Sequence, residues 1–311
     1  MLPASALRWS MVVAVLVMVV WGANFPITKY ILERVGVGCF LFFRFLLLPL
    51  VGFALLAFIY RKRWRYAVPK RDDWARFAAC GIVGHAMHVG IVMWGMNLST
   101  PFSSALVLTS GPLWTLLILA ALGTEKLRGP QVTGTLLAFG GILLFLSDKF
   151  TAGHARAGLG DVVLLFAASL FSLYTIMVRP LVTRYGPLMV LVWTLVVAAP
   201  PMLLISLPAA LALDYAAVTP LTWWWLFWAI TVSSFLGWLG WAWVNAVRGI
   251  ARSAPLQYMM PPLAAVFSWI TLGESFTWLK LVGALVVMVG VAWAQFASSP
   301  TARNTTQADS G

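Results

Sequence analysis

Long apolar runs separated by short polar stretches dominate the chain from its beginning to about residue 297. A helix needs roughly 20 apolar residues to cross the hydrocarbon core of a bilayer, and runs of that length recur throughout the sequence. They predict an all-α integral membrane fold with ten transmembrane helices. The expected spans are 10–32, 37–59, 74–97, 102–122, 130–147, 160–182, 187–207, 222–246, 253–272 and 277–297.

The two halves of the chain repeat each other at a separation of about 150 residues. Each half contains five predicted spans, an odd number, so the second half is expected to enter the membrane upside down. We therefore predict two inverted five-helix repeats, 1–150 and 158–297, around a central cavity. Such repeats are characteristic of secondary transporters, and a duplication that serves packing alone is the alternative. The matched pairs are Pro112 and Pro262, Gly123 and Gly273, Glu125 and Glu274, Gly134 and Gly283, and Gly141 and Gly290.

Composition excludes a soluble globular protein. Hydrophobic residues make up 61% of the chain, charged residues make up 10%, and the mean hydropathy is +0.91. A soluble chain of this size needs far more charge to cover its surface, so most of the sequence must face lipid or protein. The net charge of +12 does not indicate a nucleic-acid partner, because the basic residues lie in short loops between apolar runs.

The distribution of Lys and Arg predicts the orientation, since cytoplasmic loops collect basic residues. With a cytoplasmic N-terminus, fifteen of the 21 Lys and Arg residues fall on the cytoplasmic side. The opposite side receives only Arg34, Lys149, Arg156 and Lys280. This bias predicts an inner-membrane protein with both termini in the cytoplasm and a polar, disordered tail over 298–311.

Local motifs carry a family resemblance. The segment 21–25 (Trp-Gly-Ala-Asn-Phe), with Lys29 downstream and Arg44 in the next span, resembles the opening of an EamA-type member of the drug/metabolite transporter superfamily. The ends of the two halves agree, with Leu-Gly-Thr-Glu at 122–125 and Leu-Gly-Glu at 272–274. The resemblance implies ten helices around a central cavity, and export of amino acids, other metabolites or drugs.

Arg44 is the most informative candidate residue. It lies about eight residues inside the second predicted span, roughly 12 Å deep at helical rise. An ionised guanidinium at that depth is costly unless it meets water, an anion or carbonyl groups. One interpretation is an anion contact or gate in the cavity, and the other is a structural pin that bonds helix ends or pairs with Glu33. Thr194 stands where Arg44 would recur, so the halves are not chemically equivalent.

Pro26 interrupts the first predicted span and leaves the carbonyl of Gly22 without its usual partner. Trp21, Asn24 and Phe25 lie beside this weakened segment. Helix breaks at membrane depth are tolerated where they line a cavity or pack on protein. We predict that these side chains line the cavity.

The fourth and ninth spans carry similar interruptions at matched positions. Pro112 interrupts the fourth span, and Pro255 and Pro262 interrupt the ninth. Broken helices at corresponding points of two halves are the best sequence indication of a transporter site. Gln257 and Tyr258 supply hydrogen-bonding groups there, although close packing of small residues explains the same pattern.

The eighth span places Ser234, Trp238, Trp241 and Asn245 on one helical face, at spacings of four, three and four. Two indoles and an amide on one face suit the stacking and orientation of an aromatic or amphipathic substrate. An interhelical seam is the alternative for this stripe.

His85 and His88 are neighbours on the third predicted helix, and Tyr174 matches Asn24 in the repeat. We include all of them in the candidate site. The two histidines lack the further ligands of a zinc site, so neither a metal nor a cofactor is expected. Their titration near neutral pH makes proton handling conceivable.

The expected function is secondary transport of a small-molecule substrate, with export of metabolites such as amino acids by alternating access. A multidrug or lipid exporter of the same fold is the alternative. An integral-membrane enzyme would need a convergent nucleophile, base or metal set, which the sequence does not offer. No Asp or Glu lies securely inside a predicted span, which favours a facilitator or coupling through His over a carboxylate-centred exchanger.

Overall fold

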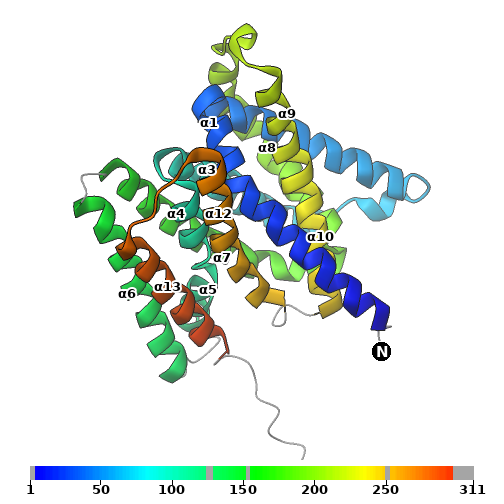
Figure 1. The fold of residues 1–311 in the computed structure, drawn as a ribbon. Coiled ribbons are helices and arrows are strands. Elements are labelled where there is room, and N and C mark those ends of the chain that lie inside the picture. The colour runs from blue at the N-terminus through cyan, green and yellow to red at the C-terminus, as the bar shows by residue number, and fades with distance from the viewer. Residues whose placement is uncertain (1–3, 124–128, 152–154, 249–252, 297–311) are drawn as a thin grey trace, which may run out of the picture.

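The computed structural model describes residues 4–123, 129–151, 155–248 and 253–296 (Figure 1). Every regular element within these ranges is a helix, and none of the described residues belongs to a strand. The all-helical part of the prediction is confirmed. The tail predicted to be disordered, 298–311, lies outside the described residues.

The first helix, α1 (Ala4–Tyr60), is 57 residues long and consists of two legs that meet at Gly36. A straight helix of that length would extend about 85 Å, whereas the hydrocarbon core is roughly 30 Å thick. Gly36 has φ 75° and ψ 163°, a conformation essentially restricted to glycine. The bend lies between the predicted spans 10–32 and 37–59 and sends the second leg away from the first (Figure 1).

Two helical stretches that follow in the first half contain irregular segments. In the first stretch a π-helical segment separates two α-helices, and in the second the α-helix is interrupted at Thr109 and Ser110. The elements are η1 (Trp64–Ala67), η2 (Arg71–Asp73), α2 (Trp74–Gly81), η3 (Ile82–Met87), α3 (His88–Leu98), α4 (Pro101–Leu108), α5 (Gly111–Ala121) and α6 (Gly129–Thr151).

The second half repeats this pattern of regular and irregular helices. A π-helical segment again separates two α-helices, and a 3₁₀ segment opens the stretch that follows. The elements are α7 (Ala155–Tyr185), α8 (Pro187–Leu211), η4 (Tyr215–Ala217), α9 (Pro220–Trp228), η5 (Ala229–Leu236), α10 (Gly237–Arg248), η6 (Ala254–Met259), α12 (Met260–Leu272) and α13 (Trp278–Phe296).

Among the described residues, four glycines with positive φ form two pairs separated by 150 residues. Gly36 and Gly186 have nearly identical backbone angles, φ 75° and ψ 163° against φ 78° and ψ 160°. Gly123 and Gly273 have φ 69° and 65°. The separation is the one found between the matched residues of the sequence, so the same turns recur in both halves.

Six of the described helical stretches are long and apolar enough to cross a membrane. Together with shorter apolar helices they make this an all-helical, multi-pass membrane protein, while the number of crossings stays a prediction. The six stretches are Ala6–Tyr60, Trp64–Leu98, Pro101–Ala121, Gly129–Ser147, Ala155–Tyr185 and Pro187–Leu211.

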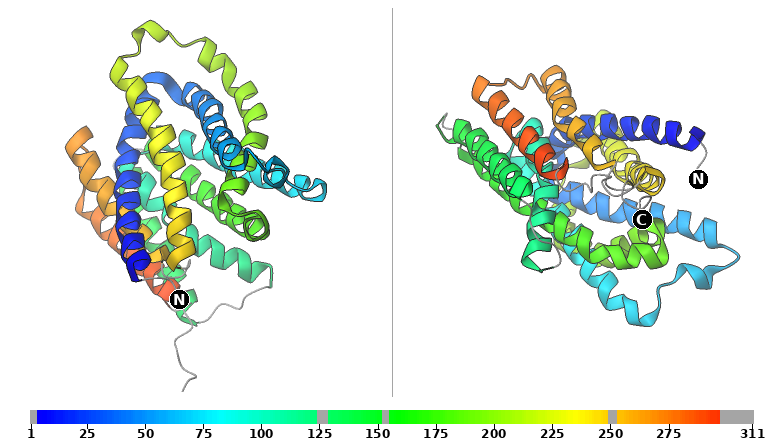
Figure 2. Two further views of the ribbon diagram at one scale, coloured as in Figure 1. Left: turned by 90° about the vertical axis from the view of Figure 1, so that its right-hand side faces the viewer. Right: turned by 90° about the horizontal axis from the view of Figure 1, so that it is seen from below.

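The helices α6 and α13 pack against each other at one edge of the bundle (Figures 1 and 2). A Cβ at Gly134 would lie 2.5 Å from the nitrogen of Ala294, and a Cβ at Gly290 would lie 2.4 Å from the nitrogen of Ala138. The pair is antiparallel, because residues further along α6 contact residues that come earlier in α13. Small residues of this kind let membrane helices approach closely.

The largest cluster of buried apolar side chains lies on the other side of the bundle. It joins the second leg of α1 to α3, α7, α8 and η5. Phe40 and Phe45 of α1, Leu195 of α8 and Ile230 of η5 are members. This cluster holds in place the helices that carry the candidate site.

Candidate substrate-binding site

Two π-helical segments, η3 and η5, mark the middle of the candidate site. π-helical turns are rare and occur frequently at functional sites. The segments are centred about 150 residues apart, so the two halves carry the same irregularity at matched positions. His85 lies in η3, and Ser233 and Ser234 lie in η5.

Arg44 extends from the second leg of α1 to η5. Its Nη1 donates a 2.6 Å hydrogen bond to Ser234 Oγ, and that hydroxyl donates to the carbonyl of Ala229 at 2.8 Å. Among the described residues, no carboxylate lies within 4.0 Å of the guanidinium. Glu33, considered above as its partner, lies 3.8 Å from Lys29 Nζ instead. Arg44 is therefore a partly buried cation held by a hydroxyl and without a counter-ion in the described part of the chain.

The two histidines lie near Arg44, and their contacts define their tautomers. His85 Nε2 is 3.1 Å from Thr194 Oγ1, whose single proton is donated to a backbone carbonyl one turn earlier, so Nε2 is the donor. His88 Nδ1 is 2.9 Å from the carbonyl of Ala167, which can only accept. Both imidazoles lie within the electrostatic reach of Arg44.

Aromatic rings pack around the two imidazoles. The ring centroid of His85 is 5.5 Å from that of Tyr174 and 6.5 Å from that of Trp238. Phe171 lies 5.1 Å from His88 and 6.2 Å from Trp238. Residues of η3, α3, α7 and α10 thus form one aromatic cluster. The described residues contain no group of three potential metal ligands, here or elsewhere.

Trp21 connects the first leg of α1 to η5 and α10. Its Nε1 donates a 2.9 Å hydrogen bond to the carbonyl of Ser233, and its ring centroid is 5.9 Å from that of Trp241. A Cβ at Gly237 would lie 2.5 Å from Trp21 Nε1, so only glycine leaves room for this contact. Trp241 itself is buried in a small apolar cluster with Met18, as an interhelical seam requires.

Asn24 lies one turn beyond Trp21 on α1. Its Oδ1 is buried and accepts no hydrogen bond from the described residues. A buried carbonyl oxygen without a donor is costly, so a donor from a bound molecule or water would satisfy it. The structure thus places an unpaired acceptor on the same helix leg as the tryptophan.

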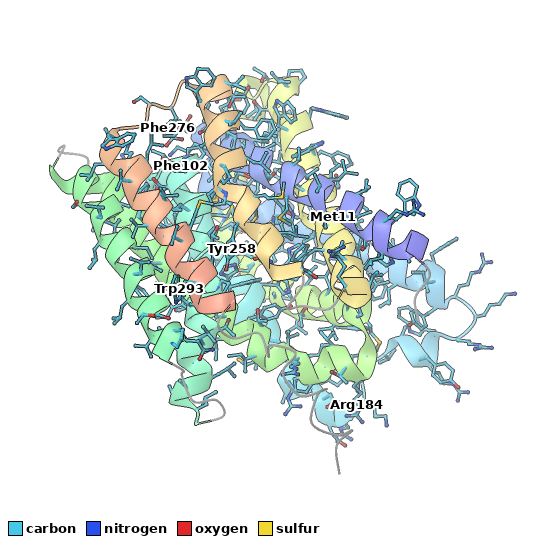
Figure 3. The ribbon with its side chains drawn as sticks, turned by 60° about the horizontal axis from the view of Figure 1, so that its bottom comes forward. Met11, Phe102, Arg184, Tyr258, Phe276 and Trp293 are labelled. Atoms are coloured by element: carbon cyan, nitrogen blue, oxygen red, sulfur yellow. The ribbon has the colours of Figure 1, made fainter. Side chains whose placement is uncertain are left out.

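The remaining candidates lie elsewhere or outside the description. Tyr258 packs against the apolar cluster that contains Phe102, on the side of α12 that faces the α6–α13 pair (Figure 3). Gln257 is partly buried in the same 3₁₀ segment, η6. The side chains of Asn245 and Pro255 lie outside the described residues. The structure does not bring Tyr258 into the cluster around Arg44.

Two of the candidate prolines lie where helices begin, and one lies inside a helix. Pro26 lies inside the first leg of α1, while Pro112 and Pro262 lie in the first turns of α5 and α12. Their missing N–H groups are tolerated in a first turn, because those groups have no intrahelical partner there. Phe25, beside Pro26, packs against the largest apolar cluster.

One carboxylate, at the edge of the predicted span 160–182, is fully buried in the structure. Asp161 in α7 is fully buried and accepts a hydrogen bond from the Ser99 hydroxyl at the turn between α3 and α4. Lys29 Nζ donates to the carbonyl of Asn97 at 2.7 Å, and Glu274 accepts from a backbone nitrogen of α4 at 3.4 Å. The sequence placed Asp161 at the edge of a span, where its burial could not be foreseen.

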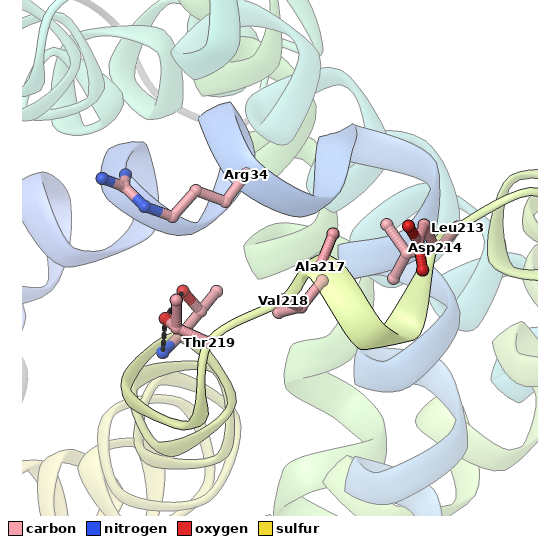
Figure 4. Close-up of a pocket in the computed structure, with 7 residues that line it drawn as sticks. Arg34, Leu213, Asp214, Ala217, Val218 and Thr219 are labelled. Carbon is pink, nitrogen blue, oxygen red and sulfur yellow. Dashed lines mark hydrogen bonds between the residues drawn. The ribbon is translucent and has the colours of Figure 1, made fainter.

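A separate cleft of about 280 Å³ lies beside the loop between α8 and α9 (Figure 4). Arg34, Asp214 and Thr219 are among its lining residues. The guanidinium of Arg34 packs 3.5 Å from the Tyr30 ring centroid and donates to the Tyr30 carbonyl at 3.0 Å. None of the sequence-predicted site residues lines this cleft.

Comparison with known proteins identifies the family. The profile of the EamA-like transporter family matches residues 8–147 and 158–295, which together make up most of the chain. The chain belongs to the EamA-like transporter family. The two matched ranges give this EamA-like transporter one family unit in each half.

Two curated relatives are similar to this EamA-like transporter along nearly their whole length. A probable terminal-alkyne amino-acid exporter of Streptantibioticus cattleyicolor is 27% identical, with 91% of each chain covered. A probable amino-acid metabolite efflux pump of Escherichia coli is 25% identical, with 90% of this chain and 92% of the relative covered.

A solved protein structure supports the fold of the EamA-like transporter. It matches with a TM-score of 0.62 at 16% sequence identity, over 93% of this chain and 98% of the other. At this identity the likeness concerns the fold alone.

Proposed function

We propose that this EamA-like transporter is a secondary transporter that exports small organic metabolites, such as amino acids, by alternating access. The observation that carries the proposal is Arg44, a partly buried cation that donates to a serine hydroxyl and has no acidic partner among the described residues. Ionisable groups inside membrane proteins mark substrate or ion pathways, and an anionic substrate would supply the missing partner. Both relatives described above are named for amino-acid export, which supports that substrate class.

The proposed architecture is two inverted repeats of five membrane-crossing helices around the Arg44 site. The paired glycine turns and the paired π-helical segments support this arrangement, because each recurs at the separation of the repeat. Residues from both halves meet at Arg44, which comes from the first half and bonds Ser234 of the second. A site between two repeats is the arrangement that alternating access requires.

We propose an inner-membrane location with both termini in the cytoplasm. The excess of Lys and Arg on one side of the predicted spans supports this orientation. Cysteine accessibility tests it: a single cysteine introduced at Lys62 should react with a membrane-impermeant thiol reagent in inside-out vesicles and remain protected in intact cells.

The function is tested by uptake and efflux of a labelled amino-acid panel in proteoliposomes, with and without an imposed pH gradient. We expect movement of one class of amino acids or their derivatives that depends on Arg44. Transport of hydrophobic drugs or of lipid probes, with no movement of any amino acid or derivative, would refute the metabolite assignment and support the alternative of a multidrug or lipid exporter.

A further inference from the structure

The charges around Arg44 restrict the substrate further, and this inference rests on the proposed function. We infer that the site takes an organic anion whose carboxylate is not accompanied by a charged amine. N-acylated amino acids and similar acids fit this description, whereas zwitterionic amino acids do not. The argument depends on where the acidic side chains of the chain lie.

The site supplies a binding partner for a carboxylate. Arg44 donates through one terminal nitrogen to Ser234, at 2.6 Å, and no acidic side chain of the described residues neutralises it. A guanidinium can bind a carboxylate in a bidentate way, through two parallel N–H···O hydrogen bonds. The site therefore offers charge and geometry for one carboxylate.

The site supplies no anionic partner for an ammonium group among the described residues. A buried ammonium needs an anion or several acceptors, because its desolvation is otherwise uncompensated. Each acidic side chain that the structure describes has another contact or is exposed, and the side chain of Asp148 in α6 lies outside the description. Glu33 is near Lys29, Asp73 binds Arg184 and Tyr185, Asp161 binds Ser99, Asp214 binds a backbone nitrogen of its own turn, Glu274 binds the start of α4, and Asp72 is exposed.

The neutral groups of the site fit an uncharged nitrogen. Asn24 Oδ1 is a buried acceptor with no donor among the described residues, and an amide N–H would satisfy it with no added charge. Tyr174, Phe171 and Trp238 provide aromatic surface for an apolar body. An ammonium placed among these rings would also lie near the guanidinium, and the two like charges would repel each other.

The test uses two matched sets of ligands on the full-length protein in proteoliposomes. N-acetylphenylalanine carries only the carboxylate, phenylalanine carries both charges, and phenylalaninamide carries only the amine. N-acetylleucine, leucine and leucinamide form the aliphatic set. Counterflow of each labelled compound gives the rate, and quenching of tryptophan fluorescence gives binding independently of movement.

We expect the N-acetyl compound of at least one set to be transported at least tenfold faster than its amino acid, with no transport of the amide. Arg44→Gln should abolish this preference, Arg44→Lys should retain part of it, and Arg179→Gln, at an exposed position of α7, should match the wild type. If Arg44→Gln does not fold, the comparison of the N-acetyl compound with its amino acid on the wild-type protein still tests the inference.

Two outcomes would overturn the inference in different ways. Transport of the free amino acid at a rate equal to or above that of its N-acetyl derivative would refute the inference and leave the proposed function standing. No binding and no transport of any compound in either set, by protein that elutes as a folded species, would refute both.

Discussion

Replacing Arg44 with methionine separates the two interpretations of this residue. Methionine has a similar volume and no charge, so the change removes the guanidinium without opening a large cavity. An arginine at the centre of a membrane helix costs about 3 kcal/mol, and a hydrogen bond from a charged donor contributes about 2 kcal/mol. Ser234 keeps its bond to the carbonyl of Ala229, so no buried hydroxyl is orphaned. We therefore expect Arg44→Met to stabilise the fold by about 1 kcal/mol and to abolish transport.

Thermal unfolding in detergent and flux in proteoliposomes measure the two effects. For a protein of this size, 1 kcal/mol corresponds to a rise in Tm of about 2 °C. Removing one partner of a structurally required buried pair would instead cost about 3–5 kcal/mol. A fall in Tm of about 6 °C or more, or unchanged flux in a stable variant, would refute the assignment of Arg44 to the substrate site.

Two further predictions concern glycines. A Cβ at Gly84 would lie 2.2 Å from Tyr174 Cδ2, so Gly84→Ala should displace that ring. We expect this change to cost about 1–3 kcal/mol of stability and to reduce transport. Gly140→Ala is the control: a Cβ there has nothing within 4 Å, so stability and transport should not fall in the same assays. Gly36→Ala and Gly186→Ala should each lower the free energy of unfolding by about 1–3 kcal/mol, and unequal losses would contradict the equivalence of the two turns.

The sequence predicted the large-scale features because they depend on composition and repetition. A long apolar run indicates a membrane helix, because backbone N–H and C=O groups in lipid find no water and must hydrogen-bond to each other. The pairs Pro112 and Pro262, and Gly123 and Gly273, predicted the repeat because turns and breaks require particular residues. The bend at Gly36 likewise lies between two predicted spans, because its backbone conformation requires a glycine.

The finer geometry of the site could not be read from spacing. Membrane helices are apolar on all sides, so periodicity does not reveal which face meets another helix. The π-helical segments change the register within η3 and η5 and have no residue signature of their own. Ser234 and Trp241 were expected on one stripe, yet Ser234 contacts Arg44 while Trp241 packs on Trp21. Phe171 was not among the candidate site residues, and its contacts with His88 and Trp238 depend on the packing of α7 against α3 and α10.

The contact between α6 and α13 has a mechanical consequence. Backbone meets backbone there, because a Cβ added at Gly141 would lie only 2.6 Å from the nitrogen of Val287 and one added at Gly283 only 2.9 Å from the nitrogen of Phe145. Neither helix can roll or slide without driving main-chain atoms into each other, and each half of the chain contributes one of the two helices. In the alternating-access transport proposed above, this pair would be the fixed point, and the displacement that exposes Arg44 would grow with distance from it.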